Sequence, residues 1–369
     1  MRTEKLLSTS KGPDPLVPIC FILSSQRRRI IKALQTISRT VVLLLAILLA
    51  ACNAKPQLDY SLSLSDAADG ETGESVVAVA LSADGAFAAV ATIDGAVSVW
   101  DIAQRKQIQS WPQEEFGGGA QFLKFTASGK MLLLAGVDHS VEEYAERQAD
   151  LNYFMILDIA DSSAKRIWTM EGARLTAVSP SEDGSRILAG FSNGLMVLFD
   201  KATSSRRDYS LHTDKITDLK LSPDGKFALS GSVDTAAVYW DTATGDILQT
   251  FTHNNRAAKV AFDSTFSVGF TSDTLNNQRL WNLDSGELTA PLNHHQRWMY
   301  ISTARFSANG KRLLIASPSK AIGIWNPING ENIARWHIDF PVVDVAENNR
   351  GDLVSVGSTG LVEVWKRQW

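Results

Sequence analysis

The chain of 369 residues carries 36 basic and 40 acidic side chains, a formal charge of −4, and two cysteines. Eight basic and two acidic residues precede Cys52, so the chain from Cys52 onward has a formal charge of −10. This domain lacks the positive surface that nucleic-acid binding needs, and with Cys20 upstream it cannot form an internal disulfide. We expect no nucleic-acid partner and a fold stabilised by core packing alone.

Residues 1–51 have the pattern of an export signal. Basic residues between 27 and 39 precede the apolar run 41–51, which is shorter than the roughly 20 residues of a transmembrane helix. The run ends in Leu49-Ala50-Ala51-Cys52, which resembles the lipobox of bacterial lipoproteins. The resemblance implies cleavage between Ala51 and Cys52 and a lipid on the sulfur of Cys52. A secretory signal with a chance cysteine is the alternative.

The residue after the cysteine bears on the location of the protein. Asn53 stands where the family's inner-membrane retention signal would have Asp. The resemblance therefore implies a protein of the bacterial cell envelope, anchored by lipid to the outer membrane and facing the periplasm. Residues 52–57 would form a short lipidated tether. Residues 27–32 also resemble a twin-arginine export signal, although an ordinary basic region explains them as well.

A unit of about 40 to 45 residues, the length of a propeller blade, repeats through residues 58–369. Each unit contains a strand that ends in a large apolar residue, most often followed by Asp or Asn: Trp100, Leu157, Phe199, Trp240, Trp281, Trp325 and Trp365. Turns such as Asp84-Gly85 and Asp224-Gly225 favour tight hairpins. The fourth unit shows four short strands, at 216–221, 227–230, 237–240 and 247–251. The pattern predicts an all-β fold, a seven-bladed β-propeller.

The fourth unit resembles the repeats of the WD-repeat family. The resemblance implies a hydrogen-bonded network that braces the blade, formed by His212, Ser230 or Ser232, Asp234 and Trp240. Other units keep only parts of this set, such as Asp94 with Trp100 in the first and His253 with Trp281 in the fifth.

The two ends of the repeat region complement each other. The seventh unit has three strands and ends four residues after Trp365, so it lacks its outer strand. Residues 58–64 are apolar at every second position, which predicts a strand without a blade of its own. We expect this strand to complete the last blade and close the ring, which protects the open sheet edges.

One face of the ring is the expected binding surface. With the strands of a blade called a to d from the centre outward, the d–a and b–c connections of WD-repeat propellers lie on one face. Three unusual segments fall there: residues 112–116 with Glu115 and Phe116, residues 294–300 with His295, Arg297, Trp298 and Tyr300, and an insertion in blade two, residues 138–152. Arg, Trp and Tyr are frequent in binding hot spots. Alternatively, Trp298 and Tyr300 are core residues of a strand and the insertion is neutral.

Catalytic and metal-binding motifs are not evident in the sequence. The six histidines show no metal-ligand spacing, His294-His295 is their single cluster, and neither a nucleophile elbow nor a phosphate loop occurs. We therefore expect no metal, no cofactor and no catalysis, and a scaffold that binds protein partners. Two alternatives stay open. Residues 240–245, 281–286 and 325–330 also resemble quinoprotein-type propellers, usually eight-bladed, which include an outer-membrane assembly lipoprotein, and some propellers are lactonases or dehydrogenases.

Overall fold

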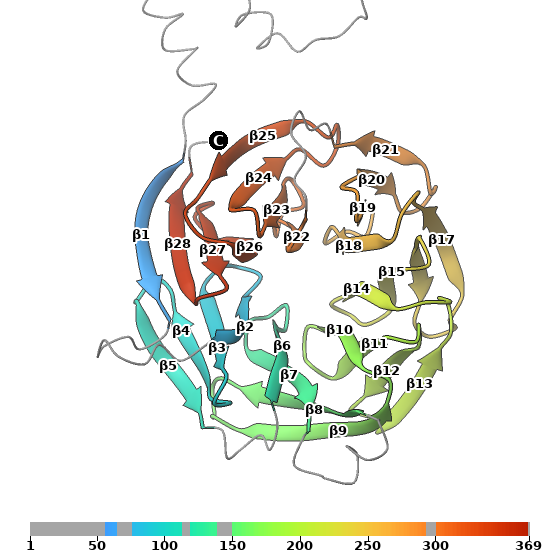
Figure 1. Ribbon diagram of the computed structural model, residues 1–369, viewed down its shortest axis with the longest axis horizontal. Helices are drawn as coiled ribbons and strands as arrows, with labels where there is room; N and C mark the ends of the chain where they lie inside the picture. Colours follow the sequence, from blue (N-terminus) through green and yellow to red (C-terminus); the bar gives the residue numbers. More distant parts are fainter. Residues whose placement is uncertain (1–55, 65–75, 113–118, 139–149, 293–299, 368–369) are drawn as a thin grey trace, which may run out of the picture. The chain divides into compact units, whose positions relative to one another are not determined.

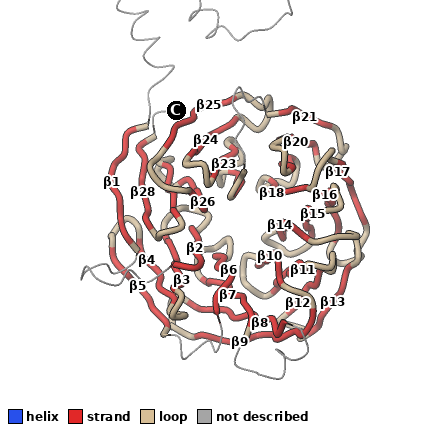
Figure 2. The backbone as a smooth tube through the Cα atoms, viewed as in Figure 1, coloured by secondary structure: helices blue, strands red, loops and turns tan. Residues whose placement is uncertain are grey.

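The regular structure is entirely β-strand in the part of the chain that the computed structural model describes, residues 56–64, 76–112, 119–138, 150–292 and 300–367 (Figure 2). These residues form seven antiparallel sheets of four strands each, arranged around a ring (Figure 1). The predicted all-β, seven-bladed propeller is therefore confirmed.

The first four blades follow the chain in order. Blade one contains β2 (Val76–Leu81), β3 (Phe87–Thr92), β4 (Val97–Asp101) and β5 (Lys106–Trp111). Blade two contains β6 (Gly119–Phe125), β7 (Met131–Val137), β8 (Asp150–Asp158) and β9 (Ala164–Gly172). Blade three contains β10 (Leu175–Pro180), β11 (Arg186–Phe191), β12 (Met196–Asp200) and β13 (Ser205–Tyr209). Blade four contains β14 (Ile216–Leu221), β15 (Phe227–Ser232), β16 (Ala236–Asp241) and β17 (Ile247–Thr252).

The last three blades include the one that joins the two ends. Blade five contains β18 (Ala257–Phe262), β19 (Val268–Asp273), β20 (Gln278–Asn282) and β21 (Leu288–Pro291). Blade six contains β22 (Thr303–Phe306), β23 (Leu313–Ser317), β24 (Ala321–Trp325) and β25 (Asn332–His337). Blade seven contains β26 (Val342–Glu347), β27 (Leu353–Gly357), β28 (Leu361–Lys366) and the N-terminal β1 (Gln57–Ser63).

Tight turns between strands a and b place these strands in register. In blade four, Asp224 Oδ1 accepts hydrogen bonds from Ser222 Oγ, at 2.7 Å, and from the amide of Lys226, at 3.1 Å. Gly225 follows with a φ of 70°, a left-handed value that glycine adopts without a steric penalty. The same Ser-x-Asp-Gly turn occurs in blade one, where Asp84 accepts the same two bonds.

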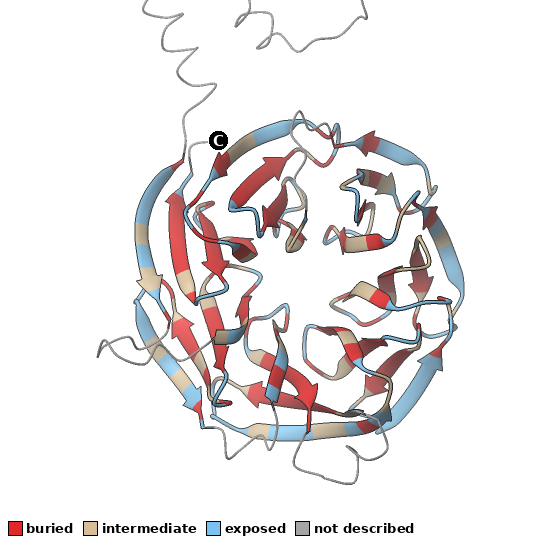
Figure 3. Ribbon diagram, viewed as in Figure 1, coloured by how far each residue is buried: buried red, intermediate tan, exposed pale blue. Residues whose placement is uncertain are grey.

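The core lies between neighbouring blades. Strands b and c are buried along nearly their whole length, whereas outer strands such as β13 are exposed (Figure 3). Sheets pack on both faces of each inner strand, which explains why these strands are continuous apolar runs. Between blades seven and one, for example, Leu81 and Val90 pack in one cluster with Val354 and Val364.

Strand β1 closes the ring as expected. It pairs antiparallel with β28, with Leu58 opposite Trp365 and Leu62 opposite Val362. The strand covers residues 57–63, one position earlier than the predicted 58–64. Leu64 follows the strand, is buried, and donates its amide to the carbonyl of Gly360 at 3.0 Å. That bond anchors the end of β1 to the turn between β27 and β28.

Blade two corrects the predicted boundary of the insertion. Residues 150–152, expected to belong to the insertion, are part of β8, and Asn152 pairs with Val137 of β7. The reason is the buried side chain of Asn152, which donates to the carbonyls of Met170 and Ala173 and accepts from the amide of Leu175. Residues 139–149 of the expected insertion lie outside the described residues.

Candidate functional site

A hydrogen-bonded network crosses blade four, from the d–a connection to strand b. His212 Nδ1 lies 2.9 Å from Asp234 Oδ2, and His212 Nε2 lies 2.9 Å from Ser230 Oγ. Burial lowers the pKa of His212, so the imidazole is neutral at neutral pH. An ionised carboxylate only accepts hydrogen bonds, so Nδ1–H donates to Asp234 and Nε2 accepts the hydroxyl proton of Ser230.

This Ser-His-Asp arrangement resembles a hydrolase triad in its bonds but not in its surroundings. Ser230 has no accessible surface, so no substrate can reach its hydroxyl. Asp234 also accepts the amides of Thr213 and Ala236, each at 3.0 Å, which ties together the two connections of the blade. Of the two candidate serines, Ser230 is the one that contacts His212, whereas Ser232 donates to the carbonyl of Asp214. The network braces the blade.

Trp240 does not join this network. Its indole Nε1 is buried and has no hydrogen-bond partner among the described residues, while its ring packs against Tyr209 at 4.5 Å between ring centroids. The expectation that Trp240 completes the hydrogen bonds of blade four is therefore wrong. The indole instead contributes buried apolar area.

Blade five makes the contact that blade four lacks. Trp281 Nε1 donates to Thr271 Oγ1 at 2.7 Å, and His253 Nε2 lies 2.8 Å from the same oxygen. Burial, and the nearby positive charge of Arg279, lower the pKa of His253 to about 4. Sequence reasoning paired His253 with Trp281 but missed Thr271, although Thr271 follows His253 by 18 residues, the interval between His212 and Ser230.

The face formed by the b–c and d–a connections displays large apolar side chains. Ile93 and Leu275, in the b–c connections of blades one and five, are 71% and 66% exposed. Tyr300, in the d–a connection before β22, is 64% exposed, so the alternative in which Tyr300 is a core residue is wrong. Val77, at the d–a end of β2, is also exposed. Glu115, Phe116, His295, Arg297 and Trp298 lie outside the described residues.

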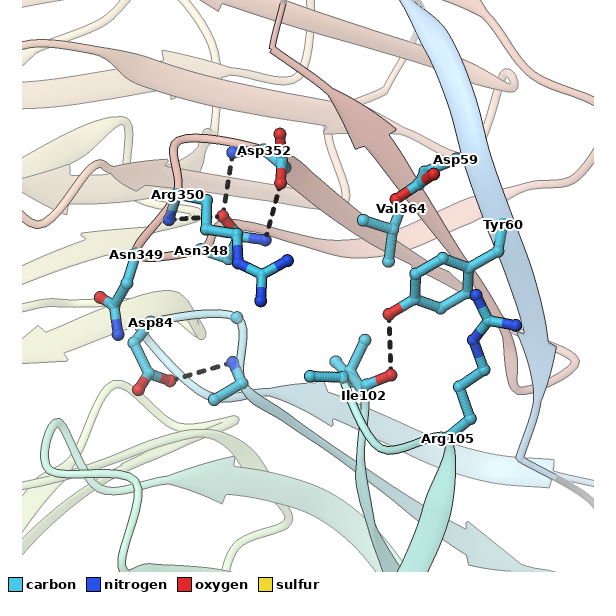
Figure 4. Close-up of a pocket in the computed structure, with 13 residues that line it drawn as sticks. Asp59, Tyr60, Asp84, Ile102, Arg105, Asn348, Asn349, Arg350, Asp352 and Val364 are labelled. Carbon is cyan, nitrogen blue, oxygen red and sulfur yellow. Dashed lines mark hydrogen bonds between the residues drawn. The ribbon is translucent and has the colours of Figure 1, made fainter.

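The opposite face, formed by the a–b and c–d connections, holds a pocket at the seam of the ring (Figure 4). The pocket has a volume of about 350 Å³ and lies between the turns of blades one and seven. Tyr60 of β1 donates its hydroxyl proton to the carbonyl of Ile102 at 2.7 Å, and the guanidinium of Arg105 lies 3.9 Å from the centre of the Tyr60 ring. Burial raises the pKa of Tyr60, so its hydroxyl stays protonated and able to donate. These contacts fasten the closing strand to blade one.

Metal and membrane-spanning features are not found in the described ranges. No group of three or more His, Cys, Asp or Glu side chains there is placed to hold a metal ion. No helix there is long and apolar enough to cross a bilayer.

The arrangement of four-stranded sheets around a ring defines a β-propeller. Two segments match a family model described as "WD domain, G-beta repeat": residues 67–101, which include strands a to c of blade one, and residues 203–241, which include strands a to c of blade four. These two matches and the seven-bladed ring support a WD-repeat propeller, as the fourth repeat predicted. A search among curated proteins gave no match.

Proposed function

We propose that this WD-repeat propeller is a non-catalytic scaffold that binds a protein partner through the face of its b–c and d–a connections. The observation that carries the proposal is the set of large apolar side chains exposed there, including Ile93, Leu275 and Tyr300. Exposed apolar side chains on a rigid ring lose water on binding without a large ordering cost, and tyrosine is among the residues most frequent in binding hot spots. WD-repeat propellers generally act as interaction scaffolds.

We further propose that the scaffold is held at the bacterial outer membrane by a lipid on Cys52. The direction of β1 supports this arrangement. Strand β28 starts at the b–c turn and ends at Lys366 on the opposite face of the ring. Gln57 pairs with Lys366, so β1 begins on that face, the one formed by the a–b and c–d connections. A tether before Gln57 spans at most about 3.5 Å per residue. Residues 52–56 would therefore keep the a–b and c–d face towards the bilayer and leave the opposite face free for a partner.

The proposed role in binding is tested by capture from intact cells. The protein is crosslinked in the cell envelope, purified and analysed by mass spectrometry, with Ile93→Asp, Leu275→Asp and the Arg297→Ala/Trp298→Ala pair as variants. Ile328→Asp is the matched control, since Ile328 is 76% exposed but lies in a c–d connection on the opposite face. We expect a partner that is lost in the first three variants and kept in the control. Equal capture by all variants would place the interaction elsewhere.

The proposed anchor has a separate test. Cys52→Ser removes the acceptor of the lipid, so the protein should move from the membrane fraction to the soluble fraction. Two or three acyl chains give stable attachment because each buried methylene contributes about 0.8 kcal/mol. Retention of Cys52→Ser in the membrane fraction after a high-salt wash would contradict the lipid anchor while leaving the binding face untouched.

A further inference from the structure

The innermost strands of the blades line a cavity in the centre of the ring. The cavity has a volume of about 240 Å³ and is lined by the ends of strands a where they lead into the a–b turns. Lys124 of β6, Lys220 of β14 and Arg305 of β22 each occupy the position before the last residue of their strand, and all three line the cavity. Residues at this register position face the channel.

One cation and one carboxylate of this cavity satisfy each other. Arg305 Nη2 lies 2.9 Å from Asp344 Oδ2, and Arg305 also donates to the carbonyls of Leu81 and Ser82. Asp344 accepts two further bonds, from the amides of Leu81 and Val345, at 3.1 and 2.9 Å. This pair joins blades six, seven and one, and most of the acceptor capacity of Asp344 is used within it.

Neither lysine donates a hydrogen bond from its ammonium group among the described residues, although Lys220 forms an ion pair with Asp218. The side chain of Lys124 makes no hydrogen bond or ion pair within the described part of the chain. Lys220 Nζ lies 3.8 Å from Asp218 Oδ1, beyond hydrogen-bond distance, and the other oxygen of Asp218 accepts the amide of Val260. Burial, and the charge of Lys220, lower the pKa of Lys124 to about 8, although the carboxylates of Asp344 and Asp218 act in the opposite direction.

The balance of charge in the channel is opposite to that of the rest of the domain. Lys220 and Asp218 of β14, Lys259 of β18 and Asp344 of β26 act on Lys124, and Arg305 of β22 pairs with Asp344. Together with Lys124 these are four cations and two carboxylates, a formal charge of +2. The chain from Cys52 onward has a formal charge of −10. The positive charge is therefore concentrated in the centre of the ring, where these side chains are partly shielded from water.

We propose that the central cavity binds a small doubly charged oxyanion of the phosphate type between Lys124 and Lys220. Both ammonium groups donate only, and an oxyanion supplies acceptors for both. Ser179 also lines the cavity; its oxygen accepts the amide of Leu221 at 3.0 Å, so its hydroxyl proton is available to the anion. The volume is below the several hundred Å³ of sites for drug-sized molecules, which favours a small ligand. This inference is independent of the partner-binding face.

The test uses sulfate as the probe, because sulfate keeps its double charge from pH 6 to 9. Sulfate binding to the protein is measured by titration calorimetry at constant ionic strength set with chloride, for the wild type, Lys124→Met, Lys220→Met and Lys130→Met. Lys130 is an exposed lysine in the a–b turn of blade two and serves as the matched control. We expect Lys124→Met and Lys220→Met to weaken binding about ten-fold or more, the effect of one charged hydrogen bond, and Lys130→Met to leave it unchanged.

A second measurement needs no variant. Sulfate affinity of the wild type should fall as the pH rises through about 8, because Lys124 loses its proton there in the free protein. Absence of saturable sulfate binding, equal affinity in Lys124→Met and Lys130→Met, or an affinity that does not change between pH 7 and 9 would each overturn the proposal. Circular dichroism of each variant confirms that the fold is retained.

Discussion

The hydroxyl group of Tyr60 donates a 2.7 Å hydrogen bond to the carbonyl of Ile102, and this contact joins the two ends of the propeller ring. Tyr60 belongs to β1, the outer strand of blade seven, whereas Ile102 lies in the c–d connection of blade one. Closure therefore has two components: strand pairing between β1 and β28 within blade seven, and a side-chain contact from β1 to the next blade.

Removing the hydroxyl group of Tyr60 should weaken the contact between β1 and blade one without opening the ring. Tyr60→Phe keeps the ring beneath Arg105 and deletes one hydrogen bond, so we expect the free energy of unfolding to fall by about 1 kcal/mol. Urea unfolding followed by tryptophan fluorescence measures the change. Tyr300→Phe, at an exposed position, should have no effect. An equal loss of stability in both variants would contradict a specific role for Tyr60.

Deleting the closing strand should have a far larger effect. Without residues 57–64, β28 becomes an unpaired edge and the buried side chain of Leu64 is lost. We expect a lower melting temperature, a broader thermal transition and aggregation on heating. A synthetic peptide of the deleted sequence, added in trans, should restore part of the stability by mass action. Scanning calorimetry that shows an unchanged transition would mean that closure by β1 is dispensable.

Thr271 should contribute more to the free energy of unfolding than the burial of a small side chain would provide. Thr271→Val keeps the shape of the side chain but leaves Trp281 Nε1 and His253 Nε2 without their common partner, and unsatisfied buried groups cost about 1 to 3 kcal/mol each. Thr250→Val, on the exposed outer strand β17, is the control and should be neutral. Similar urea midpoints for the two variants would show that the hydrogen bonds of blade five contribute little.

His253 should make the fold sensitive to mild acid. Its folded pKa is about 4, below the ordinary 6.5, so between pH 6.5 and 4 the unfolded chain binds a proton that the folded chain does not. Stability is therefore lost as the pH falls through this window, by up to about 3 kcal/mol. His253→Gln should be less stable at pH 7 yet show a flatter pH dependence. A pH dependence of His253→Gln that parallels that of the wild type would contradict this assignment.

Lys124 should be a destabilising residue at neutral pH. Its folded pKa of about 8 lies below the ordinary 10.5, so its charged form costs stability below pH 8, and the cost disappears as the pH rises from 8 to 10.5. Lys124→Met should therefore raise the free energy of unfolding at pH 7, on the order of 2 kcal/mol, with a smaller gain at pH 10. Urea unfolding at the two pH values, with Lys130→Met as the control, measures the difference. A loss of stability in Lys124→Met would show that its stem contributes more by packing than its charge costs.

The strand pattern of this chain is visible in its sequence because each blade repeats the same local signals. Turns that end in glycine between strands a and b, apolar inner strands and the aromatic end of strand c recur in nearly every unit, so blade number and the closing strand could be predicted. The network of blade four was predicted only in part. His212 and Asp234 are in contact, but whether the indole of Trp240 reaches a hydroxyl depends on small shifts of packing that residue types do not specify.

The charged cavity could not be foreseen from sequence, because its members lie on different blades. Lys124, Lys220 and Arg305 are far apart in the chain, and each alone is a polar residue in an alternating strand. Their shared signal is register: all three precede the last residue of strand a, a correspondence that emerges only when the blades are superposed in the ring. The contact of Tyr60 with Ile102 could not be predicted for the same reason, since the two residues belong to different blades.

The pairing of β1 with β28 makes the ring sensitive to the order of synthesis. The ribosome produces β1 before any other strand of the ring and its partner β28 after all of them. Until β28 has been synthesised, β1 has no partner, and the slow formation of its long-range contacts must wait for that strand. A transcript cut short within β28 would leave the same open edge as a protease that trims β1. Only a chain that includes both β1 and β28 can close, so ring closure requires that synthesis has passed Lys366.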